Sequence, residues 1–348
     1  MSEGTASSTR LHSLDGLRAI SILLVMAGHV SSTRNGGSLR VLLQLGDIAH
    51  LGVVVFFVIS GFLITTLLAQ ELDSLGRISL RLFYARRALR IFPASFAYVG
   101  VIAGLAVAGL IALRPADLAH AFTYTVNFAS DRSWYIGHLW SLSVEEQFYM
   151  LWPLAFALSG RRKGLLIAVS VMLLGPVARL SARVLLEGTP YRNLEMFPMV
   201  ADSLAAGCAL ALLRGWLESR AWYTALFRPL PSVALLVTVL ALNRYMSYTA
   251  INVFGMGLLN IGLAILVHRS VYCWRDPMGR LLNLKPVVFV GALSYSLYLW
   301  QQLFLDRTSN GWHAAFPQNV LLASGAALLS YLLLEQPLMA LRHRLRAR

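Results

Sequence analysis

The chain has 348 residues, of which 57% are hydrophobic and only 13% are charged, and its mean hydropathy is +0.63. This composition excludes a soluble protein of this length and predicts a polytopic membrane protein whose core is a bundle of helices in the bilayer. The net charge of +14 does not indicate nucleic-acid binding, because the arginines stand in short clusters between apolar runs, where anionic lipid headgroups and membrane topology explain them. The two cysteines, Cys208 and Cys273, lie far apart and form no metal-binding or disulfide pattern, so we expect no bound metal.

The first apolar run, Leu14–Val30, could be mistaken for a secretory signal. It holds Arg18, however, and nothing after His29 resembles a small-residue cleavage site, so we expect a retained first span. Further apolar segments of spanning or near-spanning length follow along the chain. We expect an all-α bundle of about ten transmembrane helices, at Leu14–Ser31, His50–Gln70, Pro93–Leu113, Leu139–Leu158, Gly164–Ala182, Met199–Leu213, Leu230–Leu242, Ile251–Val267, Val287–Phe304 and Asn319–Leu334.

The basic residues between these segments predict the topology. If the N-terminus is cytoplasmic, most of the arginines and lysines in the connecting segments fall on the cytoplasmic side, as the positive-inside rule requires. An even number of spans then places the C-terminus in the cytoplasm as well. No repeat or linker divides the sequence, so we expect residues 1–348 to form one transmembrane domain with no fused soluble domain.

The first span carries ionisable residues. Arg18 and His29 are eleven residues apart, which on a helix places them on one face about 16 Å apart. Ionisable groups on one face of a membrane helix are expected to face a protein interior or a wet cavity rather than lipid. We therefore predict that this face forms a catalytic wall.

A polar stripe lies on the span that begins at Leu139. His138, Ser141, Glu145 and Tyr149 follow at helical spacing on one face. Glu145 is expected at a depth comparable to that of His29, where a carboxylate could orient an imidazole. Glu146 points about 100° away, so the geometry favours Glu145. The alternative for any one of these residues is a hydrogen bond that only packs helices.

Arginines precede the expected third span in the stretch RISLRLFYARRALRIFPASF. Arg87 and Arg90 share a face if this stretch is helical, and Arg86 stands beside them. Planar guanidinium groups suit the phosphates of a nucleotide-bearing acyl donor. The alternative is an anchor on anionic lipid.

Other polar residues in apolar segments are expected to have mostly structural roles. Ser294, Tyr295, Ser296 and Tyr298 punctuate one span, where packing is the expected role for most of them. Asp202 lies near the outer end of its span, where it could be interfacial. Three further residues are interpreted as loop or interface residues: His50, His120 and Trp134.

These motifs, in this order, resemble those of the bacterial acyltransferase-3 family of membrane O-acyltransferases. The resemblance covers nearly the whole chain and rests on LDGLRAISILLVMAGHV, FFVISGFLIT, FYARRALRIFPASF, HLWSLSVEEQFYMLWP, SYSLYLWQ and the terminal EQP of residues 335–337. It implies acyl-CoA, with acetyl-CoA as the expected form, as a cytoplasmic donor, and an acceptor hydroxyl across the bacterial inner membrane. The acceptor is then a carbohydrate or lipid-linked glycan of the envelope.

The resemblance also assigns residues. His29 takes the position of the family's essential histidine, Arg18 that of its basic partner, and Arg87 and Arg90 that of its arginine pair. His29 is then a general base or an acyl acceptor, and Glu145 or Glu146 orients it. We expect substrate contacts from the polar and aromatic residues of two spans: His138, Trp140, Ser141, Ser294 and Tyr295.

Two departures from the family pattern stand in the sequence. Many members have His where this chain has Gln301, and Arg where it has Val200. Neither the acceptor nor the acyl chain length follows from the residues. The alternatives to acylation of an envelope glycan are acylation of a secondary metabolite such as a macrolide, and a transporter or flippase in which Arg18, His29 and Glu145 form a relay.

Overall fold

The computed structural model describes residues 3–37, 41, 46–187, 195–246 and 250–339, and within these residues every regular element is helical. This confirms the predicted all-α membrane protein. The helices, in chain order, are α1 (Glu3–Val30), α2 (Ile48–Leu75), α3 (Leu80–Val107), α4 (Pro115–Thr123), η2 (Val126–Phe128), α5 (Trp134–Gly137), α6 (Leu139–Leu185), α7 (Phe197–Glu218), α8 (Ala221–Ala225), α9 (Pro229–Tyr245), η3 (Ile251–Gly255), α11 (Met256–Tyr272), α12 (Pro277–Leu282), α13 (Lys285–Phe304), η4 (Trp312–Ala314), α14 (Gln318–Ser330) and η5 (Tyr331–Glu335).

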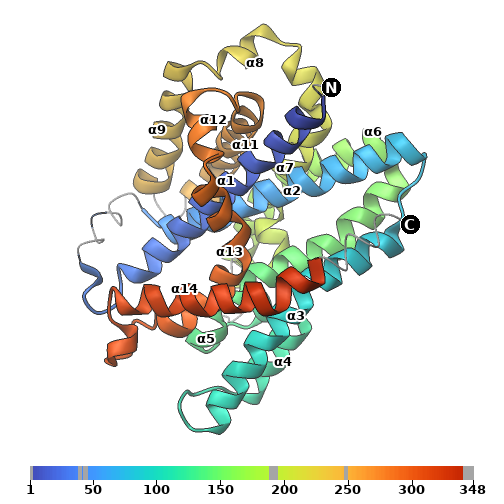
Figure 1. The fold of residues 1–348 in the computed structure, drawn as a ribbon. Helices are drawn as coiled ribbons and strands as arrows, with labels where there is room; N and C mark the ends of the chain where they lie inside the picture. The colour runs from blue at the N-terminus through green and yellow to red at the C-terminus, as the bar shows by residue number, and fades with distance from the viewer. Residues whose placement is uncertain (1–2, 38–40, 42–45, 188–194, 247–249, 340–348) are drawn as a thin grey trace.

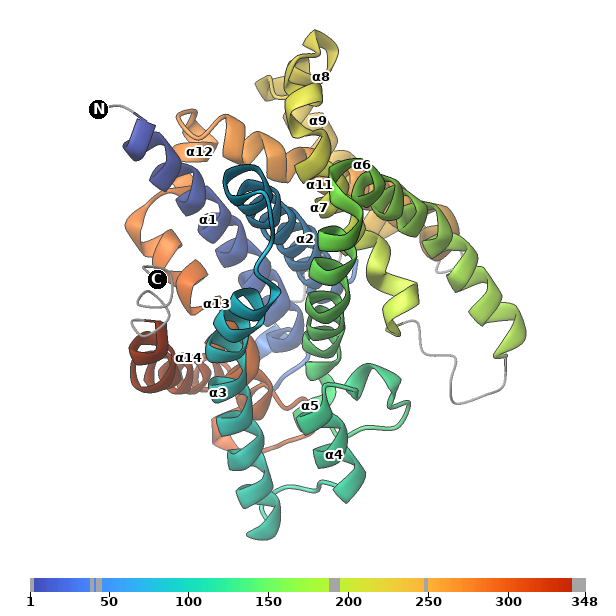
Figure 2. The ribbon, with the colours of Figure 1, turned by 90° about the vertical axis from the view of Figure 1, so that its right-hand side faces the viewer.

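Eight stretches of the described residues are long and apolar enough to cross a membrane. One of them, Trp134–Leu185, has 52 residues and is interrupted at Gly160, whose φ of 67° and ψ of −171° are accessible to glycine but not to other residues. The two halves of α6 splay apart at this point (Figure 2). If each half of α6 crosses the membrane, and α9, a shorter apolar helix of 17 residues, does so too, the chain has the ten spans expected from the sequence.

The third span begins earlier than expected. Residues 93–113 were the expected span, whereas α3 runs from Leu80 to Val107 and passes through Pro93. Proline inside a membrane helix removes one backbone hydrogen bond, which is tolerated where neighbouring helices compensate. Arg86, Arg87 and Arg90 therefore lie on the helix itself rather than before it.

Glycines allow the central helices to approach closely. A Cβ atom at Gly291 of α13 would lie 1.9 Å from the backbone oxygen of Asp15 on α1, and one at Gly61 of α2 would lie 1.9 Å from that of Leu204 on α7. Small residues at helix crossings let membrane helices pack backbone to backbone. The positions of α1 and α13, which carry most of the candidate site, are thus fixed relative to each other.

The bundle has two distinct ends (Figures 1 and 2). The start of α1, α8 and α12 lie at one end, and α4 and α5 lie at the other. Arg18 is therefore nearer the α12 end and His29 nearer the α4 end. The assignment of the α12 end to the cytoplasm remains a prediction, and four of the arginines that support it, at 342, 344, 346 and 348, lie outside the described residues.

The sequence suggested that Asp202 could be interfacial, but the structure buries it. Its side chain is 1% exposed and forms an ion pair with Arg179 of α6, with 2.8 Å between Oδ2 and Nη2. The guanidinium also donates to the backbone oxygen of Met199 at 2.5 Å. Two ionisable side chains taken out of water stabilise each other by pairing, and here the pair joins the second half of α6 to α7.

Candidate active site

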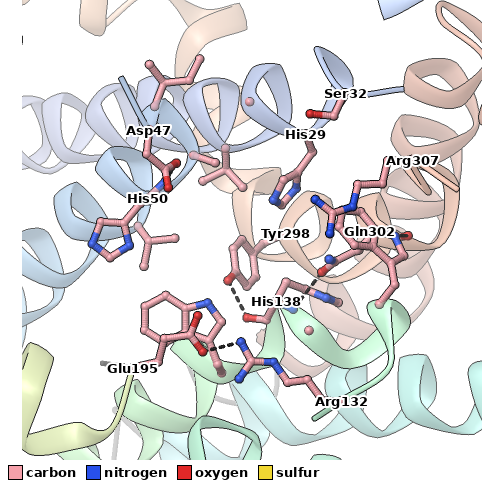
Figure 3. Close-up of a pocket in the computed structure, with 18 of the residues that line it drawn as sticks. His29, Ser32, Asp47, His50, Arg132, His138, Glu195, Tyr298, Gln302 and Arg307 are labelled. Atoms are coloured by element: carbon pink, nitrogen blue, oxygen red, sulfur yellow. Dashed lines mark hydrogen bonds and ion pairs between the residues drawn. The ribbon is translucent and has the colours of Figure 1, made fainter. Parts of the chain in front are cut away.

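A cavity of about 710 Å³ lies beside α5, at the same end of the bundle as α4, and we call it the His29 cavity; Figure 3 shows its lining. Its walls come from the ends of α1 and α13, the start of α2, and the segment around α5. The polar and aromatic residues that line it are His29, Ser32, Asp47, His50, Arg132, Ser133, Trp134, His138, Trp140, Glu195, Tyr298, Gln302 and Arg307.

His29 lies in the last turn of α1. Its Nδ1 is 3.0 Å from Oε1 of Gln301 on α13. The indole of Trp134 meets the imidazole edge to face, with 5.7 Å between ring centroids. The ring is therefore held on two sides while it faces the cavity (Figure 3).

His138 and Trp140, both expected as substrate contacts, line the same cavity. His138 is buried, and its Nε2 donates to the backbone oxygen of Leu299 at 3.0 Å, since a carbonyl can only accept. Its backbone N–H donates to Oε1 of Gln302 at 2.8 Å. Trp140 stacks on His50, with 6.2 Å between ring centroids.

The charges around the His29 cavity are mixed in sign. Arg132 pairs with Glu195 across one wall (Figure 3). The guanidinium of Arg307 lies over the ring of Trp134, with its Cζ 5.2 Å from the centroid. Asp47 accepts from the backbone N–H of His50 at the start of α2. The cavity thus presents donors and acceptors without a dominant charge.

Hydrogen bonds stabilise the loop after α13 at the rim. Asp306 accepts from the backbone N–H of Thr308 at 2.8 Å, from its hydroxyl at 2.7 Å and from the Tyr135 hydroxyl at 2.9 Å. Burial works against ionisation of Asp306, but these hydrogen bonds outweigh it and hold its pKa below the ordinary value. The carboxylate therefore stays ionised and fixes the loop that carries Arg307.

A second, much smaller chamber of about 80 Å³ lies deeper in the bundle, and we call it the Arg18 pocket. It gathers most of the residues that the sequence analysis selected on α1, α3, α6 and α13. Its lining is Arg18, Val53, Phe56, Phe57, Ser60, Arg87, Arg90, Ile91, Ser141, Leu142, Glu145, Tyr149, Ser294, Tyr295 and Tyr298.

Three arginines converge on this pocket from two helices. Arg87 and Arg90 lie on α3, three residues apart on one face, and Arg18 reaches in from α1. The Cζ of Arg87 lies 3.8 Å from the centroid of the Tyr149 ring. Nη1 of Arg18 lies 3.4 Å from Oδ1 of Asp15. Several guanidinium groups around one small space form a site for an anionic group.

Glu145 lies in the Arg18 pocket, where its Oε1 accepts from the hydroxyl of Ser60 at 2.6 Å. The sequence analysis expected it to orient His29. That expectation is wrong, because Gln301 occupies the position beside the imidazole and Glu145 lines the other chamber, among the arginines. Equal depth along two helices did not make the side chains neighbours.

Arg86 and Glu146 line neither chamber. Arg86 points to Glu71 at the end of α2, with 3.6 Å between Nη2 and Oε2. Glu146 is buried elsewhere, and its Oε1 has no hydrogen-bond partner among the described residues. It therefore cannot orient His29 either.

The two chambers meet at a shared wall, because Val53 and Tyr298 line both. The Tyr298 hydroxyl is 2.6 Å from Oγ of Ser141 and 2.7 Å from the backbone oxygen of His138. Ser141 belongs to the Arg18 pocket and His138 to the His29 cavity, so Tyr298 stands at the boundary. From the sequence, packing was the expected role for most of the polar residues on this span, Tyr298 among them.

Several residues of the site escaped the sequence analysis. His50 and Trp134 were interpreted as loop or interface residues, whereas His50 lies in the first turn of α2 and Trp134 begins α5, and both line the His29 cavity. The doublet Gln301–Gln302 at the end of a span was a usable signal, because amides are costly there unless paired. Ser60 gave no signal, since a lone serine in an apolar run is ordinary.

Comparison with known proteins decides the family. The model of the acyltransferase domain matches residues 11–335. The chain belongs to this acyltransferase family. The match includes both chambers.

Among characterised relatives, the acyltransferase is similar to the peptidoglycan O-acetyltransferase OatA of Listeria monocytogenes, at 26% identity over 85% of this chain and 50% of the relative. It is 28% identical to the putative peptidoglycan O-acetyltransferase YrhL of Bacillus subtilis, over 93% of this chain and 54% of the relative. The O-acetyltransferase OatA of Staphylococcus aureus is 26% identical, over 94% and 57%. The chain thus spans about half the length of these relatives. No solved structure matches it.

Proposed function

We propose that this acyltransferase is an O-acyltransferase that moves an acetyl group from acetyl-CoA on the cytoplasmic side to a hydroxyl group of an envelope carbohydrate. The observation that carries the proposal is the pair of chambers. An arginine-lined pocket and a histidine-lined cavity meet at one wall inside a membrane bundle of this family.

The Arg18 pocket is the proposed donor end. Arg18, Arg87 and Arg90 attract the anionic groups of acyl-CoA, and their planar guanidinium groups suit phosphate oxygens. The pocket is far too small for a nucleotide, so in this proposal the nucleotide stays outside with its phosphates facing the arginines, and the narrow, uncharged acyl-bearing arm enters. Glu145 and Ser60 line the same pocket, where the carboxylate accepts from the serine hydroxyl.

His29 is the proposed general base. Its imidazole accepts the proton of the acceptor hydroxyl while the oxygen attacks the thioester carbonyl carbon. The carbon–sulfur bond then breaks, and the thiolate of CoA takes up the proton that the imidazole received. The products are an O-acetyl ester and free CoA.

The His29 cavity is the proposed acceptor site. Its volume and its opening at the α4 end suit a sugar, and Trp134 and Trp140 offer aromatic faces beside polar groups. The names of two of the relatives point to peptidoglycan as an acceptor of that class. His138 and Trp140 are proposed acceptor contacts, and Ser141, Ser294 and Tyr295 are proposed donor contacts.

The positive-inside pattern supports an orientation in which the α12 end faces the cytoplasm and the His29 cavity faces outward, in the bacterial inner membrane. Donor and acceptor then approach from opposite sides.

Mass spectrometry of envelope glycans tests the proposal. Cells that express the wild type at a membrane level matched to each variant should carry acetyl groups on a glycan, and His29→Ala should remove them. His120→Ala is the matched control. His120 lies on α4, forms a hydrogen bond with Thr125 and lines neither chamber. Equal acetylation by all three proteins would contradict the proposed site, and a transporter would leave no acetyl group on any glycan.

A further inference from the structure

We infer that Gln301 is the positioning residue of His29, and that its side-chain oxygen fixes the imidazole as the tautomer with hydrogen on Nδ1 and a free lone pair on Nε2. The inference rests on the proposed role of His29 as a base. Gln301, rather than Glu145, then orients the imidazole.

The contact itself defines the tautomer. Gln301 is fully buried on α13, and its Oε1 lies 3.0 Å from Nδ1 of His29. An amide oxygen can only accept, so the hydrogen belongs to Nδ1. A neutral imidazole carries one hydrogen, and Nε2 is then unprotonated. The hydrogen bond made by one ring nitrogen of a histidine sets the state of the other.

Neighbouring contacts hold Gln301 in place. The next residue, Gln302, accepts from the backbone N–H of His138 through Oε1 and from Nε1 of Trp134 through its backbone oxygen, at 2.8 and 2.9 Å. Trp134 in turn packs on the imidazole of His29. The end of α13 therefore fixes the histidine, its aromatic neighbour and the start of α6 together.

A purely structural role does not explain Gln301. Its Nε2 has no hydrogen-bond partner among the described residues, so the buried amide is only half satisfied, and its Oε1 is directed at His29. A leucine would fill the same space without that unpaired group. What the amide adds is an acceptor for Nδ1–H.

An amide also differs from a carboxylate at this position. A carboxylate would stabilise the protonated imidazole strongly, whereas the neutral amide orients the ring and stabilises that form much less, so the ring can still act as a base. In the proposed reaction Nε2 takes the proton of the acceptor hydroxyl and later returns it to the thiolate of CoA. Nδ1–H stays with Gln301 throughout.

Nitrogen-15 NMR of histidine tests the inference on the full-length protein in detergent micelles, without any substrate. Labelling of the histidine rings and one-bond and long-range couplings distinguish the two tautomers, and His29→Ala identifies the His29 signals by their loss. We expect the wild type to show Nδ1–H. Gln301→Leu should lose that preference, and Gln301→Glu, which keeps an acceptor of the same length, should keep hydrogen on Nδ1.

The signals of His120, remote from both chambers, report whether each variant is folded. If Gln301→Leu does not fold, the wild type and Gln301→Glu still decide the matter. Hydrogen on Nε2 in the wild type, or an unchanged tautomer in folded Gln301→Leu, would overturn the inference. The proposed function fails on a different observation, which is glycan acetylation that survives His29→Ala.

Activity gives a second readout. Gln301→Leu should lower the rate of acetyl transfer about 10- to 100-fold with little change in the KM for acetyl-CoA, because the base is misoriented while the donor pocket is intact. A raised donor KM with an unchanged rate would speak against positioning.

Discussion

The His29 cavity and the Arg18 pocket differ in size, charge and walls, although they share Val53 and Tyr298. One has a volume of about 710 Å³, the other about 80 Å³. The cavity carries two acidic and two basic side chains, whereas the pocket has three arginines and one carboxylate, that of Glu145. A large mixed space suits a bulky neutral or zwitterionic acceptor, and a narrow basic space suits one thin arm of an anionic donor.

The same helices nevertheless build both chambers. α1 carries Arg18 in one and His29 in the other, and α13 carries Ser294 in one and Gln302 in the other. Because Gly291 lets α13 pack against the backbone of α1, the spacing between the two chambers is set by backbone contact rather than by long side chains. Substitutions should therefore affect one chamber at a time, and the following experiments test this, from the largest expected effect to the smallest.

His29→Ala removes the proposed base from the cavity and leaves the pocket intact. We expect acetyl transfer to fall about 100-fold or more, since positioned acid–base catalysis contributes at least that much. Binding of acetyl-CoA, measured by titration of the purified protein, should be unchanged. A loss of donor binding in this variant would show that the chambers are not independent.

The double variant Arg87→Ala/Arg90→Ala makes the opposite change. A hydrogen bond to a charged group is worth about 1.5–3 kcal/mol, so the KM for acetyl-CoA should rise about tenfold or more. Arg81→Ala is the matched control, because Arg81 is exposed on the same helix and lines neither chamber. Arg86→Ala should have a smaller effect than the double variant, given its contact with Glu71. An effect of Arg86→Ala equal to that of the double variant would contradict the placement of the donor.

The shared wall should control which acyl groups pass. Val53→Ala widens the boundary, and we expect transfer from propionyl-CoA and butyryl-CoA to rise several-fold relative to acetyl-CoA; one methylene group in a pocket is worth about 1–3 kcal/mol. Val53→Phe should lower transfer from every donor. Rates with the three donors on purified glycan strands provide the measurement. Unchanged ratios in both variants would show that acyl groups do not pass this wall.

Asp202 lines neither chamber, so Asp202→Ala should change the rate of acetyl transfer least. It leaves the buried guanidinium of Arg179 without its carboxylate, and removal of one partner from a buried pair costs about 3–5 kcal/mol of stability. The melting temperature in detergent should fall, while KM and the rate per folded molecule stay near the wild type. A selective change in the donor KM would indicate coupling between this pair and the Arg18 pocket.

Much of the fold was predictable because membrane helices are recognisable from the length and hydropathy of their apolar runs, and polar residues within them are few. Helical spacing correctly placed Arg87 and Arg90 on one face of a helix. It could not place Glu145 relative to His29, because depth along two helices says nothing about their rotation or about which helix stands between them.

Residues in connecting segments were the other source of error. Trp134 looked like a loop or interface residue because it stands in a polar segment between two apolar runs. In the structure its indole contacts the imidazole of His29 and lines the cavity. Asp202 looked interfacial because it lies near the outer end of its span, and its partner, Arg179, is 23 residues away in the chain. Pairing over such a distance depends on how α6 and α7 cross, which no local pattern encodes.

The wall of Val53 and Tyr298 has a consequence beyond chemistry. Two chambers that meet end to end inside a membrane would short-circuit the ion gradients of the cell if they were joined by water. The ring of Tyr298, with its hydroxyl bound to Ser141 and to the backbone of His138, lies at that boundary, where we expect it to obstruct such a route. We then expect the boundary between the proposed donor and acceptor sites to limit ion leakage too, and Val53→Ala should be tested for proton leak as well as for acyl length.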